Sequence, residues 1–249
     1  MATLYSNNDD GFVYKVVSGG SWADAREATT GTGMEAGPDN GPTSHVIYEV
    51  GRGGGFFVCT RSFFWFDTSS ITGTVASVNF ELYGKAGFGA ASSGRCIIVK
   101  SNAFGGNGTA SLTTSDFDAI VNWDHDENAD DAGVVDYSTV YDISSSSWTT
   151  SGYNSLTGTS ALKADMKNNN VVIICMMSYD YDHKYIVPTS ALNQQTSSWY
   201  TEKTGTLLDP RLNYTISTGY GNTVKGVAAA NIGKVMGVST ANISKVNGI

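Results

Sequence analysis

Apolar and polar residues alternate in short stretches along this chain, a period typical of β-strands rather than helices. The clearest stretch spans residues 75–83. Within it Val78, Phe80 and Leu82 share one face, and polar residues occupy the other. Further strands are expected at 11–17, 46–50, 56–66, 96–100, 171–178 and 212–216.

Other segments are expected to connect or flank these strands. In the long run 56–66, Arg61 and Ser62 are expected to mark the polar face. Short helices are expected at 115–122 and 160–167, because each begins with a Ser that can cap a helix. Many strands with few helices indicate an all-β fold, a β-sandwich or jelly roll formed by residues 1–218.

Composition agrees with this fold class. Gly, Ser and Thr make up about a third of the 249 residues, and only 15% are charged, which excludes a coiled coil. Aromatic residues make up 11% of the chain, which is enough to form a hydrophobic core and argues against a disordered protein. No apolar run approaches the ~18 residues of a membrane helix, so we expect no membrane partner.

The C-terminal segment 219–249 contains an 11-residue repeat. Residues 224–234 read VKGVAAANIGK, residues 235–245 read VMGVSTANISK, and residues 246–249 begin a third copy. A period of 11 can indicate a right-handed helical supercoil. The recurring Gly and β-branched residues disfavour helix, so we expect short extended segments linked by turns.

The repeat carries an apolar stripe that two and a third copies cannot bury alone. Docking on another protein or homo-oligomerisation, with a trimer favoured, would cover it; folding back on its own sandwich, or disorder, is the alternative. We call this segment the assembly arm. The stripe residues are Val224, Val227, Ile232, Val235, Val238, Ile243, Val246 and Ile249.

Charge divides the chain in the same place. The net charge is −8, but the arm contains Lys225, Lys234 and Lys245 and no acid, so +3 on the arm leaves −11 on residues 1–218. An acidic body without a basic patch argues against nucleic-acid binding. The basic arm could instead meet an acidic protein surface.

Cysteines and the N-terminus indicate the compartment. Cys59, Cys96 and Cys175 each lie in an apolar run, so we expect buried, reduced thiols rather than disulfides. The first residues have no basic or apolar signal-peptide region, and we expect synthesis in a cytoplasm.

Residues 60–71, TRSFFWFDTSSI, followed by the strand at 75–83, resemble the R-S-x-x-x-F-D-x-S-S-I motif of a jelly-roll carbohydrate-binding family named for its DNRLRE signature. Residues 10–14 and 209–214 resemble that family's first and last strands. The signature string itself is absent. A standalone sandwich with a KVNG-type repeat tail is also similar to structural proteins of tailed bacteriophages. The resemblance implies a virion component whose partners are capsid or tail proteins.

An acidic loop is a candidate Ca²⁺ site. Oxygen-bearing side chains alternate there, as a tight calcium-binding loop requires. Ala129 and Val135 stand where an EF-hand needs Gly and Glu, and a solvated acidic loop explains the segment equally well. No other cofactor is expected. The candidate ligands are Asp124, Asp126, Asn128 and Asp130.

Other side chains could contact a metal or a sugar. The segment 180–183, DYDH, is a second candidate loop, although a polar strand end would look the same. Aromatic residues could stack on sugar rings or simply fill the core. Those considered are Trp22, Trp123, Trp148, Trp199 and Tyr200.

Catalytic patterns are weak. His45, His125 and His183 lie in no triad motif, and no GxSxG, HExxH or P-loop string occurs, so we expect no enzyme. Together with this absence, the resemblance to phage structural proteins implies a non-enzymatic bacteriophage structural protein, a capsid decoration or head or tail fibre component. The alternative is a glycan-binding adhesive module of a receptor-binding protein, and a hydrolase acting on surface polymer comes third.

Overall fold

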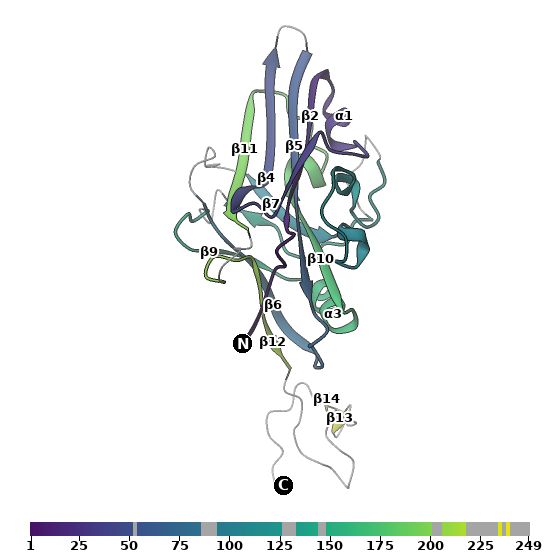
Figure 1. Cartoon of the computed structure of the whole chain (residues 1–249), viewed down its shortest axis with the longest axis vertical. Helices are drawn as coiled ribbons and strands as arrows, with labels where there is room; N and C mark the ends of the chain where they lie inside the picture. Colours follow the sequence, from purple (N-terminus) through teal and green to yellow (C-terminus); the bar gives the residue numbers. More distant parts are fainter. Residues whose placement is uncertain are drawn as a thin grey trace.

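The computed structural model describes residues 1–51, 54–85, 94–125, 133–143, 148–200, 206–217, 234–235 and 238–239. It is a mainly-β protein in which two antiparallel sheets pack face to face as a sandwich (Figure 1). The smaller sheet has the order β1–β12–β6–β9. Its strands are β1 (Ala2–Tyr5), β12 (Arg211–Ile216), β6 (Val75–Tyr83) and β9 (Tyr153–Thr157).

The larger sheet is organised around the long strand β5 (Gly54–Asp67). β2 (Gly11–Gly20) pairs along one edge of β5. Two strands pair with the other edge of β5. β4 (Asn40–Gly51) pairs with the first part of β5, up to Arg61, and β10 (Val171–Ser178) pairs with the rest, from Ser62 onward. The remaining strands are β3 (Gly33–Ala36) beside β2, β7 (Arg95–Lys100) and β8 (Tyr141–Asp142) beyond β10, and β11 (Leu192–Trp199) beyond β4.

The sandwich core lies between the two sheets. On β6 the alternation is as expected: Val78, Phe80 and Leu82 are buried, and Ser77 is exposed. The apolar residues of alternate positions on β5 and β10 face these side chains across the core. Members of this core include Phe64, Phe66, Phe80, Leu82, Ile98, Leu156, Leu162, Ile174, Met176 and Leu212.

A third layer covers the outer face of the larger sheet, on the side where α1 lies in Figure 1. Because β5 and β10 are buried on both faces, their sequences read as continuous apolar runs. The layer and the sheet enclose a second core that includes Trp22, Phe57, Phe63, Phe104, Phe117, Ile173 and Met177. The covering elements are α1 (Trp22–Arg26), η1 (Phe104–Gly106), η2 (Thr114–Asp118) and the π-helical turn η3 (Tyr179–His183).

This third layer corrects the expectation for Arg61 and Ser62. Both side chains are fully buried, and neither marks a solvent-exposed face. Neighbouring strand residues point to opposite faces, so Ser62 faces the sandwich core and Arg61 faces the covering layer. A polar residue in a strand signals solvent only when nothing packs on that face.

The two expected helices have different outcomes. α3 (Ser160–Asn168) is confirmed, but Thr159 caps it in place of the expected Ser160. The helix expected at 115–122 is wrong beyond Asp118, where η2 ends. The chain leaves helical geometry because Ile120 forms a β-bridge with Ser101.

The three thiols behave as expected. Cys59, Cys96 and Cys175 are free and buried, and burial raises the pKa of each. No helix in the described part of the chain is long and apolar enough to span a membrane.

In the assembly arm the described residues form one small antiparallel pair, β13 (Lys234–Val235) with β14 (Val238–Ser239). At these four residues the backbone is extended, as expected. The rest of the stripe, Val224, Val227, Ile232, Ile243, Val246 and Ile249, lies outside the described residues, and its role stays a prediction.

Candidate functional site

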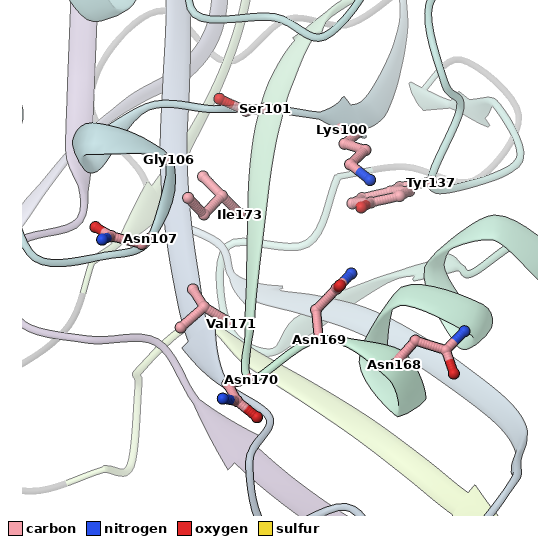
Figure 2. A pocket seen from close by; sticks show the side chains of 10 residues that line it. All are labelled: Lys100, Ser101, Gly106, Asn107, Tyr137, Asn168, Asn169, Asn170, Val171 and Ile173. Carbon is pink, nitrogen blue, oxygen red and sulfur yellow. The ribbon is translucent and has the colours of Figure 1, made fainter.

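A polar cleft of about 510 Å³ opens where α3 ends, beside the start of β10 and the end of β7 (Figure 2). Figure 2 shows Val171 and Ile173 of β10 between two polar walls. One wall carries Lys100 and Tyr137, and the other carries Asn107. The cleft is concave, and its lining is mainly polar with a small apolar floor. Most small-ligand sites are mainly apolar, so a ligand that suits this cleft would itself be polar.

The first wall is held by the carboxylate of Asp165. The Lys100 ammonium lies 2.8 Å from one of its oxygens, and the Tyr137 hydroxyl donates to the same atom. The Asn169 amide donates to the other oxygen at 3.1 Å. Burial alone would raise the pKa of Asp165, but the hydrogen bonds from Lys100 and Tyr137 outweigh it and lower that pKa. The ammonium and carboxylate charges therefore cancel at this wall.

The second wall is a glycine loop laid over Trp65. Gly108 has a φ of +75°, and a Cβ there would lie 2.9 Å from the indole ring, so only glycine allows this approach. Gly106 also has a positive φ, but a Cβ at that position would meet nothing within 4 Å. The carbonyl oxygen of the Asn107 side chain accepts from the Thr109 backbone and hydroxyl, which orients the Asn107 amide.

Three consecutive asparagines complete the cleft at the end of α3. Asn168, Asn169 and Asn170 are all exposed. The backbone carbonyls of Asn169 and Asn170 accept hydrogen bonds from Thr68, which fixes the turn. Within the described residues, the Asn168 and Asn170 side chains have no hydrogen-bond partner. Their donors and acceptors are available to a ligand.

A second polar cluster is buried beneath the covering layer. Arg61 forms a fork with Asp182, with Nε 2.9 Å from Oδ2 and Nη2 2.7 Å from Oδ1. Its remaining donors reach the backbone carbonyls of Phe117 at 2.8 Å and Arg26 at 2.9 Å. One side chain of β5 thus ties down η3, η2 and α1 together.

Charge and stacking reinforce this tie. Burial disfavours the charged form of Arg61, but the Asp182 carboxylate more than compensates and raises the pKa of Arg61. The guanidinium carbons of Arg26 and Arg61 each lie 4.3 Å from the centre of the Trp123 ring. Arg26 also pairs with Glu27, whose pKa is raised mainly by burial. The cluster has full internal contacts and is best understood as a structural fastening.

The predicted calcium loop is only partly visible. Asp124 is described, whereas Asp126, Asn128 and Asp130 lie outside the described residues. Among described residues, no group of three or more His, Cys, Asp or Glu side chains could hold a metal. The neighbouring His125 contacts Asp118 at 3.2 Å, which anchors the start of the loop to the covering layer. The Ca²⁺ site stays a prediction.

The candidate loop 180–183 does not form a site with converging ligands. Asp182 is the buried partner of Arg61, and Asp180 pairs with Arg95 on the surface. The His183 Nε2 atom lies 2.8 Å from a carboxylate oxygen of Asp136. Asp180, Asp182 and His183 each contact a different partner, so the interpretation of 180–183 as one metal-binding loop is wrong, and a sugar contact by this segment stays a prediction.

The candidate aromatic residues form no stacking platform at the cleft. Trp22 and Tyr200 are 1% and 0% exposed, and both fill the cores. Trp148 is partly buried and donates to the Ser197 carbonyl at 2.9 Å. Trp123 stacks on the buried arginines, and Lys85 lies over the Trp199 ring at 4.1 Å. Core filling and loop anchoring account for these side chains.

The cleft was not predicted from the sequence. Its available signals were the run of three asparagines after a helix and the GGNG segment at 105–108. Compared with protein-family models and with curated proteins, the chain has no match.

Proposed function

We propose that this chain is a non-enzymatic structural protein of a tailed-bacteriophage particle, a capsid decoration or a head or tail fibre component. Its sandwich faces outward, and the assembly arm attaches it or joins copies of it. The observation that carries the proposal is the division of the chain into a body of −11 and an arm of +3 that bears an apolar stripe.

The architecture of the body supports this division. The Arg61–Asp182 fork fastens three covering segments to the larger sheet, so the body has two closed cores of its own. An apolar stripe on a segment appended to a body that has cores of its own suits binding to another chain.

The extended pair β13–β14 also supports an assembly role. Val235 and Val238 are paired in the sequence Val-Met-Gly-Val, and the arm repeats this Val-x-Gly-Val/Ile pattern at 224–227 and 246–249. Strand backbone offers hydrogen bonds as well as apolar side chains to a partner. The partners would be other virion proteins or further copies of this chain, with a trimer favoured.

Deletion of residues 219–249 tests the proposal. The truncated body should stay folded by circular dichroism but lose oligomerisation and particle association, measured by light scattering and co-sedimentation. A matched triple variant, K225Q with K234Q and K245Q, keeps the apolar stripe and isolates the charge. If the deleted protein assembles like the full chain, the arm is not the assembly element.

A second candidate, a glycan-binding adhesive module, is favoured by the polar cleft. The cleft lies on the body, so adhesion through it and assembly through the arm are compatible in one virion protein. The host surface would then be the partner of the body.

A further inference from the structure

We propose that the cleft at the end of α3 binds a neutral oligosaccharide through its asparagine amides. This inference rests on the second proposed function and names its site and ligand class. It does not depend on the assembly arm.

The donors and acceptors of the cleft suit a ligand that carries many hydroxyl groups. An asparagine amide presents a carbonyl oxygen and an NH₂ group side by side, and a hydroxyl can donate to one and accept from the other. Asn168 and Asn170 offer both without described protein partners, and Asn107 presents an amide already oriented by Thr109. Adjacent hydroxyls on a sugar ring match such paired groups.

The electrostatics favour a neutral ligand over an anion. The Lys100 ammonium is offset by the Asp165 carboxylate 2.8 Å away. The cleft also lies at the C-terminal end of α3, where the helix dipole is negative. That negative end favours hydroxyl donors and disfavours carboxylates or sulfates.

The size and floor agree with this ligand class. A volume of about 510 Å³ lies within the range of small-molecule sites, roughly 300–1,000 Å³. Val171 and Ile173 form an apolar strip between the polar walls, against which the C–H face of a sugar ring can pack (Figure 2). The side chains of the cleft therefore supply both kinds of contact that a sugar needs.

The test uses the full chain and defined soluble probes. A panel of neutral trisaccharides, made of glucose, mannose, galactose or xylose units, is titrated by calorimetry and by NMR with ¹⁵N-labelled asparagine. Oligomers of uronic acids form the anionic arm of the panel. At least one neutral probe should bind saturably and shift the side-chain amide signals of Asn168 and Asn170.

Three variants locate the binding. The double variant N168A/N170A should weaken the affinity by roughly 10-fold or more, from two lost hydrogen-bonding amides. Asn193→Ala, at an exposed asparagine of β11, which β4 and β5 separate from β10, is the matched control and should bind as the unmodified protein does. Gly106→Asn tolerates the positive φ and places a side chain in the open space beside the cleft, so it should also weaken binding.

Some outcomes would overturn the inference. These are no saturable binding to any neutral probe, equal affinity of N168A/N170A and the unmodified protein, or binding confined to the uronic acids. Every variant keeps the assembly arm, so a failure of glycan binding would not count against assembly through the arm. Conversely, loss of assembly without loss of binding would separate the two roles.

Discussion

The fastening of the covering layer leads to a quantitative prediction about the Arg61–Asp182 pair. Both side chains are 0% exposed, and the guanidinium makes two hydrogen bonds to the carboxylate and two to backbone carbonyls. Removing one partner of a buried pair leaves the other charge uncompensated, which costs about 3–5 kcal/mol. Asp182→Asn keeps the shape of the side chain and removes its charge. We therefore expect the free energy of unfolding to fall by an amount near the lower end of that range.

The double variant gives the sharper result. Arg61→Met alone leaves the Asp182 carboxylate buried without its fork, and Asp182→Asn alone leaves Arg61 charged and poorly paired. Combined, the two changes remove both charges, so the double variant should cost about 1–3 kcal/mol less than the sum of the single variants. It should still be less stable than the original, because the Phe117 and Arg26 carbonyls lose their donor.

Urea unfolding followed by circular dichroism measures these changes through the midpoint at constant m-value. Arg95→Met is the matched control, because Arg95 is 45% exposed in its pair with Asp180 and should cost less than about 1 kcal/mol. Two results would refute the view that this fork holds the covering layer in place. One is a loss of unfolding free energy in the single variants as small as that of the control, and the other is strict additivity of the two losses in the double variant.

Two further predictions follow from individual residues. Gly108→Ala should destabilise the protein by about 1–3 kcal/mol, because it adds strain at a positive φ and a clash with Trp65. Gly106→Ala adds the strain alone and should cost less. A larger loss of stability for Gly106→Ala than for Gly108→Ala would contradict this reasoning. The three buried thiols, whose pKa values are raised by burial, should not react with a thiol reagent at mildly alkaline pH until urea unfolds the chain, and rapid labelling of the native protein would show that they are accessible.

Strands with a clear apolar pattern could be predicted from the sequence. β6 and β10 match the predicted segments because alternation and continuous apolar runs report burial on one or both faces. β11 was missed because its buried residues are polar. Thr196 hydrogen-bonds to Thr43 at 3.0 Å, and Gln195 to Ser197 at 2.8 Å, so side-chain pairing replaces apolar burial there.

The sites depend on contacts that no local pattern contains. Arg61 and Asp182 are 121 residues apart in sequence, and their pairing follows from the third layer, which the sequence did not predict. The cleft likewise depends on the contact between Lys100 and Asp165, which are 65 residues apart in sequence. It also depends on Gly108, where a side chain would clash with Trp65. Sequence composition predicted the acidic body and basic arm, because charge is a sum that needs no fold.

The central claim is that the body faces outward on a particle and the arm attaches it. Electron cryo-microscopy of phage particles purified from the source of this chain tests this proposal most directly. The account predicts density for the two-sheet body on the particle surface, with residues 219–249 directed into contacts with neighbouring virion proteins or further copies. Absence of the chain from purified particles, or an arm that points away from every neighbour, would contradict it.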